Sequence, residues 1–377
     1  MGLAVAACQV PGGADRGDWV EPDLALFETG PYIILGAPGT ARVALKDDRI
    51  PAPTVEWWVA PAEASAAGAP APEVHEVVAE RYEDLWVATL TDIPIGPSIR
   101  YRVRSSRGTT QEYAFRAGSP QGSRFRFAAY GDTREGHSVH RAIVEALARE
   151  AVDFVLHTGD MVQRGGRQDQ WMRFFQIERP LLVDTPIVPA VGNHDMSGRD
   201  YFRRYFLHSK WAGDRHYYAL DWGHLRIVTV DSGIECRDGC AQYAFAERAL
   251  AEGARRGQLM VLALHHPPYS SGKHGSAPEV QKPITELARR HGVELVITGH
   301  DHNYERTRPI DGTTYIVSGS AGAPIRAVRP RWFTAEARTE PHYVLVDVEE
   351  DRLIVRGVNL RGETFDTAVL EDVPPAS

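Results

Sequence analysis

Six side chains of the kinds that ligate metal ions each follow an apolar run of the sequence. They are two aspartates, one asparagine and three histidines: Asp132, Asp160, Asn193, His265, His300 and His302. Carboxylate, amide oxygen and imidazole ligands together suit zinc, manganese or iron better than calcium. In "GHDH" the two histidines are two positions apart, so on an extended segment both point to the same side. Together these residues predict a transition-metal site.

Each motif alone carries little information. A Gly-Asp pair after a strand is ordinary turn chemistry, and a lone histidine after an apolar run is more often a packing residue than a ligand. The prediction therefore depends on the joint appearance of "YGD", "TGD", "GNHD", "LHHPP" and "GHDH" in this order along the chain.

Strands alternating with helices must position these side chains. The apolar runs ending at Asp132, Asp160 and Asn193 are separated by helical patterns over residues 138–150 and 170–182, and two more helices are expected over 244–256 and 279–292. This order is typical of parallel βαβ units. Because ligands bind where such strands end at their carboxyl edge, we expect the six side chains to converge there.

The chain before these units has a different pattern. Short β-runs separated by turn residues extend from Gly30 to about Phe115, and the cluster "AGSPQGS" closes them. We expect a flexible N-terminal tail over residues 1–25, a β-sandwich over 26–118 that looks like a fibronectin type III module, and a second domain over 123–377. A length of 377 residues agrees with two domains.

Composition excludes several classes of protein. With 43% hydrophobic and 24% charged residues, the chain is neither collagen-like nor disordered. A formal net charge of −8 argues against nucleic acid or an anionic membrane as a partner, so any phosphate must be held by a local site. No run approaches the roughly 20 apolar residues of a membrane-spanning helix.

Taken in order, the motifs resemble those of the calcineurin-like metallophosphoesterase superfamily. "GHDHNYER" and the preceding sandwich resemble the purple acid phosphatase branch in particular. The resemblance implies an α/β metallophosphoesterase domain, with two packed mixed β-sheets flanked by helices, after the N-terminal β-sandwich. It also implies two divalent or trivalent transition metal ions (Fe, Zn or Mn). Asp132, Asp160 and His302 would hold the first ion, and Asp160 would bridge to a second ion held by Asn193, His265 and His300.

The resemblance also implies roles for two residues beside the ligands. His194 would face the substrate phosphate, and Asp195 would orient the His194 ring from behind. Arg134 either clamps phosphate oxygens bidentately or is a surface salt-bridge partner. His266 and His274 lie in a glycine- and serine-rich loop, as supporting residues or leaving-group acids, or simply as exposed loop histidines.

Two positions depart from the family pattern. Gln163 stands where the purple enzymes have a tyrosine, and Arg134 stands where other members of the superfamily have a histidine. The first metal position is therefore one ligand short. The Gln163 amide, His137 or a water molecule could complete it, and we favour water.

The expected reaction is direct hydrolysis of a phosphate ester by a metal-activated hydroxide. The substrate would be a small-molecule or protein phosphomonoester, as in acid phosphatases. The alternatives are a phosphodiesterase acting on cyclic nucleotides or phospholipid headgroups, and a non-catalytic binding or adhesion protein in which the sandwich is the working part.

The three cysteines bear on localisation. "VAAC" around Cys8 resembles a lipoprotein cleavage site, although only seven residues precede the cysteine; it is either a truncated signal with a lipid anchor or an ordinary tail. Cys236 and Cys240 either close a small disulfide loop or are free thiols. We expect a secreted, periplasmic or outer-membrane lipoprotein.

Overall fold

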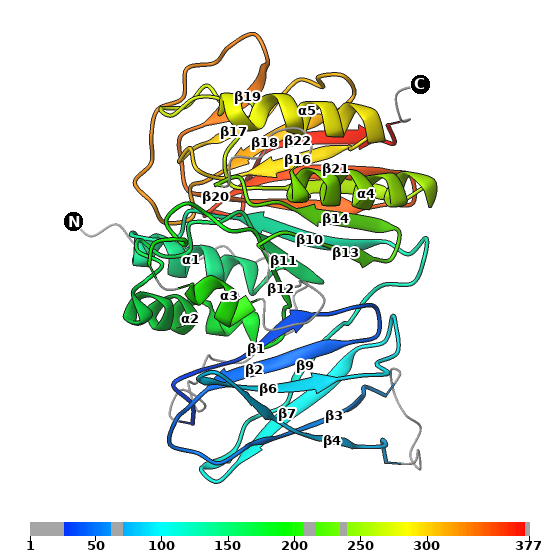
Figure 1. The fold of residues 1–377 in the computed structure, drawn as a ribbon, viewed down its shortest axis with the longest axis vertical. Coiled ribbons are helices and arrows are strands. Elements are labelled where there is room, and N and C mark those ends of the chain that lie inside the picture. The colour runs from blue at the N-terminus through cyan, green and yellow to red at the C-terminus, as the bar shows by residue number, and fades with distance from the viewer. Residues whose placement is uncertain (1–25, 62–70, 199, 207–215, 234–239, 374–377) are drawn as a thin grey trace, which may run out of the picture.

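The computed structural model describes residues 26–61, 71–198, 200–206, 216–233 and 240–373. Figure 1 shows two parts stacked along the long axis of the molecule, with the blue and cyan strands of the first part below the helices and sheets of the second. Among the described helices, none is long and apolar enough to cross a membrane.

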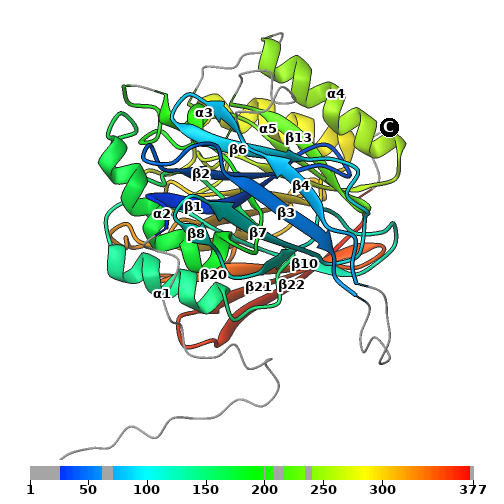
Figure 2. The same ribbon diagram turned by 90° about the horizontal axis from the view of Figure 1, so that it is seen from below.

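The first part is a β-sandwich, as the sequence predicts, and Figure 2 shows it from below. Strand β7 (Ile99–Ser105) alternates between a buried and a wetter face, with Ile99, Tyr101 and Val103 buried. These side chains pack on those of the opposite sheet, including Ile33. The remaining strands are β1 (Thr29–Leu35), β2 (Ala41–Lys46), β3 (Thr54–Val59), β4 (His75–Val78), β5 (Glu80–Tyr82), β6 (Leu85–Leu90), β8 (Gly108–Thr109) and β9 (Tyr113–Phe115). The likeness to a fibronectin type III module stays a prediction.

The described residues of the second part form two mixed sheets and five helices. The helices are α1 (His137–Leu147), α2 (Gln168–Leu182), α3 (Tyr201–Phe206), α4 (Ala241–Arg255) and α5 (Pro278–His291). The strands are β10 (Phe125–Tyr130), β11 (Phe154–His157), β12 (Ile187–Pro189), β13 (Tyr218–Trp222), β14 (Leu225–Thr229), β15 (Leu259–Ala263), β16 (Leu295–Thr298), β17 (Tyr304–Thr307), β18 (Thr314–Ser318), β19 (Thr334–Arg338), β20 (His342–Val348), β21 (Arg352–Asn359) and β22 (Thr364–Glu371).

The second sheet, with strand order β13-β14-β15-β16-β18-β17-β19, buries both of its faces. Ile227 and Ile297 belong to the core that this sheet shares with the first sheet. Val228 and Val296, one position along each strand, point the other way and belong to the core beneath α4 and α5. This arrangement of two packed sheets flanked by helices is the one that the sequence predicts.

The first sheet runs through both parts of the molecule. Its order is β22-β21-β20-β10-β11-β12-β1-β2-β6-β5, so β1 of the sandwich lies parallel to β12, with Ile34 opposite Ile187. Two tyrosine hydroxyls also cross the junction: Tyr32 donates to the Tyr205 carbonyl (2.9 Å) and Tyr101 to the Val183 carbonyl (2.5 Å). The sequence gives no sign of this shared sheet, and the boundary at residues 118–123 stays a prediction.

Two of the three cysteines, Cys8 and Cys236, lie outside the described residues. Cys240 precedes α4 as its N-cap, where its sulfur accepts the backbone N–H of Tyr243 (3.2 Å), and it is disulfide-bonded. One of the two states considered for this cysteine, the free thiol, is therefore excluded.

Candidate metal centre

Parallel strands bring the predicted ligands to one place. Strands β10, β11 and β12 pair in parallel, as do β14, β15 and β16. Their carboxyl ends meet along the line where the two sheets face each other. Each predicted ligand lies in a turn just beyond such an end, so the six side chains come from five separate strand ends.

Four of the six side chains converge on one point, which we call the second position. The Nε2 atom of His265 lies 3.3 Å from Oδ1 of Asp160 and 3.1 Å from Oδ1 of Asn193, whose oxygen is also 3.2 Å from Nδ1 of His300. Donor atoms about 3 Å apart are spaced like the ligands of one metal ion, which stand about 2.0 to 2.2 Å from it.

The remaining donors form a first position beside it. Nε2 of His302 lies 3.6 Å from Oδ1 of Asp132, and Asp160 offers its other oxygen, Oδ2, to this side. Asp132, Asp160 and His265 are fully buried and present ligand atoms within 4.8 Å of one another. Oδ1 of Asp132 is buried without a hydrogen-bond partner, which is costly for a carboxylate unless a cation lies beside it.

The backbone at these turns is strained in a way that aims the ligands inward. Asp132 and Asp160 have φ of 57° and His300 has φ of 69°, a left-handed conformation that residues other than glycine rarely adopt. Strained residues of this kind concentrate at functional sites. Glycines just before two of the ligands allow close approach: a Cβ on Gly192, before Asn193, would lie 2.1 Å from the Asp160 nitrogen, and one on Gly299, before His300, would lie 2.5 Å from Oδ2 of Asp132.

Hydrogen bonds to backbone carbonyls orient two of the imidazoles. Nδ1 of His265 lies 2.9 Å from the Thr158 carbonyl and Nδ1 of His302 lies 2.8 Å from the Pro324 carbonyl. A carbonyl only accepts, so Nδ1 carries the proton and Nε2 turns toward the donor cluster. This is the usual arrangement of a metal-ligating histidine.

The electrostatics of the cluster favour positive charge. Burial alone would lower the pKa of His265, but the Asp160 carboxylate outweighs it and raises the pKa to about 10. A metal ion bound here would displace that proton. Burial and the neighbouring His265 lower the pKa of His300 to about 2, so its imidazole stays neutral and keeps a lone pair.

Asp195 supports the centre through the backbone. Its carboxylate is fully buried and accepts N–H groups of Asp160 (2.9 Å), Met161 (2.9 Å), Val162 (3.2 Å) and Gly192 (2.9 Å). The ring of His194 is instead held by the Gln163 carbonyl, 2.9 Å from Nδ1. Within the described residues, Asp195 therefore fixes the two ligand loops and does not contact the imidazole that we expected it to orient.

Arg134 lies inside the centre. Its Nε is 3.3 Å from Oδ2 of Asp160, its Nη2 is 3.2 Å from Nε2 of His302, and its Nη1 is hydrogen-bonded to Oε1 of Gln163. The alternative of a surface salt-bridge partner does not describe this side chain, which is 7% exposed. His137, the other residue considered for the first position, lines a cavity of about 480 Å³ with Arg134 and Gln163.

Histidines of the 265–274 loop surround the outer side of the centre. The rings of His266 and His274 lie 4.4 and 4.6 Å from that of His300, centroid to centroid. His274 is hydrogen-bonded to Arg326, which lies after β18 in "GAPIR". Arg326 was not predicted from the sequence, because only its charge distinguishes it there.

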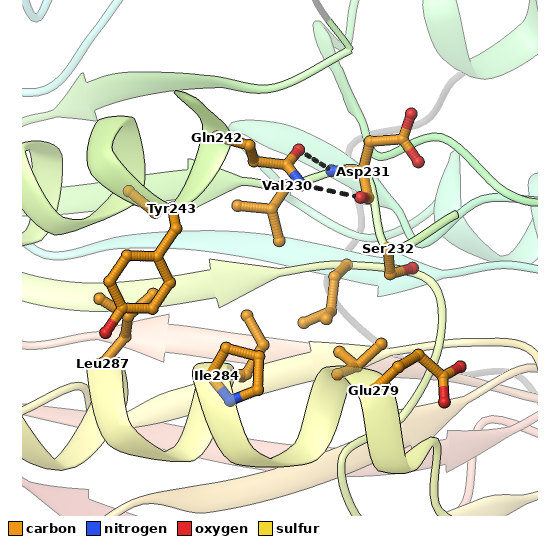
Figure 3. A pocket seen from close by; sticks show the side chains of 12 residues that line it. Val230, Asp231, Ser232, Gln242, Tyr243, Glu279, Ile284 and Leu287 are labelled. Atoms are coloured by element: carbon orange, nitrogen blue, oxygen red, sulfur yellow. Dashed lines mark hydrogen bonds between the residues drawn. The ribbon is translucent and has the colours of Figure 1, made fainter. Parts of the chain in front are cut away.

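Figure 3 shows a separate small pocket between α4 and α5, where Gln242 is hydrogen-bonded to the Asp231 backbone; none of the six donors lines this pocket.

Comparisons with known proteins find relatives among the phosphoesterases. Residues 125–304 match the family model of the calcineurin-like phosphoesterases. The chain is 28% identical over 225 residues to "Probable inactive purple acid phosphatase 27" of Arabidopsis thaliana, covering 48% of this chain and 37% of that protein. It is 28% identical over 224 residues to a "Nucleotide pyrophosphatase/phosphodiesterase" of Hordeum vulgare, covering 48% of this chain and 61% of that one. The matches thus span between about a third and three fifths of these relatives' lengths.

Two solved structures share the fold. Purple acid phosphatase PPD1 from yellow lupin (Lupinus luteus) seeds superposes with a TM-score of 0.78 at 20% identity, covering 92% of this chain and 75% of that chain. The structure of PhoD superposes with a TM-score of 0.69 at 12% identity, covering 92% of this chain and 89% of that chain. In the lupin protein, as here, the fold extends over the sandwich as well as the two-sheet part.

Proposed function

Because this chain carries a calcineurin-like phosphoesterase domain and is similar to purple acid phosphatases, we propose that it is a metal-dependent phosphoric ester hydrolase. The observation that carries the proposal is the convergence of Asp160, Asn193, His265 and His300 at the second position, with Asp132 and His302 adjoining it. We propose phosphomonoesters, small molecules or phosphoproteins, as the substrate class.

The six donors would hold two transition metal ions, Fe, Zn or Mn, with Asp160 between them. Bound there, the ions supply Lewis acidity toward phosphate oxygens and lower the pKa of a water molecule. The mixed set of oxygen and imidazole donors suits these metals. Two divalent ions carry four positive charges against the two carboxylates, so the site would keep a net charge of about +2 that attracts phosphate, although the chain as a whole carries −8.

His194 is placed to act on the substrate. Its ring is partly exposed, and Nε2 lies 3.9 Å from Oδ2 of Asp160, at the rim of the centre. Nδ1 is held by the Gln163 carbonyl, so Nε2 is the ring nitrogen on the side of the centre, where a protonated ring can donate to the ester oxygen as it leaves. Asp195 acts as a positioning residue for the Asp160 and Gly192 loops.

Arg134 is proposed to contact the substrate as well. A guanidinium presents two parallel N–H groups that match two phosphate oxygens. Arg134 contacts the donors Asp160 and His302, so its guanidinium is close enough to the centre to reach a phosphate group bound there.

A diesterase is the second candidate, because one relative is named a nucleotide pyrophosphatase/phosphodiesterase. The test supplies manganese, zinc or iron and compares p-nitrophenyl phosphate with bis(p-nitrophenyl) phosphate. Faster hydrolysis of the monoester supports the proposal, and faster hydrolysis of the diester supports the second candidate. No hydrolysis of either by metal-loaded protein would leave the non-catalytic alternative; one relative is itself named a probable inactive purple acid phosphatase.

We also propose that the protein is exported, either secreted or held at the membrane through Cys8. The disulfide of Cys240 supports an oxidising compartment. Fractionation of cells that express the natural gene, with and without Cys8→Ser, tests the anchor. A lipidated protein should move from the membrane to the soluble fraction on substitution, whereas an unchanged distribution would contradict the anchor.

A further inference from the structure

An arginine side chain, Arg134, contacts the donors of the first metal position. Arg134 reaches it from the loop after β10, and its guanidinium touches a donor with each of its three nitrogens: Oδ2 of Asp160, Nε2 of His302 and Oε1 of Gln163. The first two of these are ligands that the first ion would need. The third is one of the groups considered for completing its coordination.

A donor atom cannot serve both partners at once. Nδ1 of His302 carries its proton toward the Pro324 carbonyl, so Nε2 has a single lone pair. That lone pair faces Nη2 of Arg134 at 3.2 Å and cannot bind a metal ion while it accepts this hydrogen bond. A guanidinium has N–H donors only and no lone pair to offer an ion, so it cannot take part in the coordination. The first ion must therefore displace Arg134.

The second position is different. Its donors are joined by three contacts of 3.1 to 3.3 Å, which run from Oδ1 of Asp160 through His265 and Asn193 to His300. Among the described residues, Arg134 is the only lysine or arginine within 4 Å of the Asp160 carboxylate, and it faces the other oxygen. No lysine or arginine among the described residues has to leave before an ion enters the second position.

We propose that Arg134 competes with the first metal ion, so that the chain binds one ion tightly at the second position and another weakly at the first. The inference rests on the proposed metal centre. The displaced guanidinium has a place to go: the adjoining cavity of about 480 Å³ is lined by Glu135, which already lies 3.1 Å from Nη1, and by Asp169.

The test is a titration of metal-stripped protein with Mn²⁺, followed by calorimetry and by native mass spectrometry for the number of ions bound. We expect the wild type to bind one ion tightly and the second on the order of 100-fold more weakly. In Arg134→Ala the second ion should bind at least about 10-fold more tightly than in the wild type. Arg134→His, which places an imidazole there, should bind two ions tightly.

Two controls separate this effect from a general one. Arg173→Ala removes another arginine from the same cavity, one that contacts none of the donors, and should titrate like the wild type. His302→Ala should abolish the weak ion and keep the tight one, which assigns the weak ion to the first position. Circular dichroism verifies that each variant is folded, and Arg134→Met serves as a second variant if Arg134→Ala is not.

The outcomes distinguish this inference from the proposed function. Two ions of equal affinity in the wild type, unchanged in Arg134→Ala and Arg134→Met, would overturn the competition while leaving the metal centre intact. No Mn²⁺, Zn²⁺ or Fe²⁺ binding by folded wild type would overturn both.

Discussion

His194 lies at the metal centre without being one of its donors. Its ring is held by the Gln163 carbonyl and its backbone N–H donates to Oδ1 of Asp160 (2.9 Å). A change confined to the ring leaves the backbone contact in place. Replacing the ring should therefore lower the catalytic rate without removing the metal ions.

We expect His194→Ala to lower kcat by about 10²- to 10⁴-fold, the usual contribution of a general acid. Metal content, measured by elemental analysis of the same preparation, should equal that of the wild type. Loss of metal in parallel with activity would contradict the role, because it would mean that the ring supports the ligands and not the reaction.

At the scale of elements, the turns after β11 and β12 touch at Gly192. A methyl group there would lie 2.1 Å from the Asp160 nitrogen and 2.3 Å from its Oδ1. We expect Gly192→Ala to lower the free energy of unfolding by about 3 kcal/mol and to weaken metal binding at the second position, because the loops must separate. Denaturant unfolding and metal titration measure the two effects.

Gly257→Ala is the matched control for this substitution. Gly257 has φ of 62°, yet a Cβ would meet nothing within 4 Å. Backbone strain alone should cost about 1 to 2 kcal/mol, with metal binding unchanged. Equal losses in the two variants would show that crowding between the ligand loops is not the cause.

His216 ties α3 to the second sheet and makes stability depend on pH. Burial would lower its pKa, but Asp200 (2.8 Å, just before α3) and Asp231 (3.4 Å, after β14) outweigh burial and raise the pKa to about 9. Because the folded pKa exceeds the unfolded value of about 6.5, this stabilisation is complete below pH 6.5 and lost as pH rises through 9.

In His216→Gln this pH dependence should disappear. Between pH 6.5 and 9 the wild type should lose about 2 kcal/mol more unfolding free energy than the variant, allowing for partial exposure. His75→Gln, on the exposed strand β4, is the control and should follow the wild type. Parallel curves for wild type and His216→Gln would refute this assignment.

At the scale of the whole molecule, the sandwich and the two-sheet part share one sheet. Strand β12 pairs with β1, and Tyr32 packs on Phe175 of α2, with ring centroids 4.6 Å apart. We therefore expect one cooperative thermal transition by calorimetry for the chain, with equal calorimetric and van't Hoff enthalpies. Two separate transitions would contradict the shared sheet.

Residues 123–377 alone should fold poorly. Removing the sandwich leaves β12 as an edge strand and uncovers an apolar face of α2, both of which favour aggregation. Expression of residues 123–377 beside residues 26–377 tests this expectation, since only the longer chain should remain soluble and monomeric by gel filtration. A stable, soluble 123–377 would mean that the junction contributes little.

The sequence was sufficient for the features that are local or periodic. Apolar runs ending in Gly-Asp, "GNHD" and "GHDH" predict both the strands and the residues at their ends, and Asp160, His265 and Asn193 do converge. The pairing of β1 with β12 was not predicted, because it joins residues about 150 positions apart with no motif at either end. The Asp195 contacts and the contacts of Arg134 with the metal donors were not predicted, because they depend on how loops from different strands pack.

The central claim is that these loops form a metal centre, and anomalous diffraction from crystals grown with Mn²⁺ tests it most directly. We predict a strong anomalous peak at the second position, about 2.0 to 2.3 Å from the donor atoms of Asp160, Asn193, His265 and His300. A weaker peak should lie between Asp132 and His302. Crystals of the manganese-treated protein with no anomalous peak among these six side chains would contradict the account.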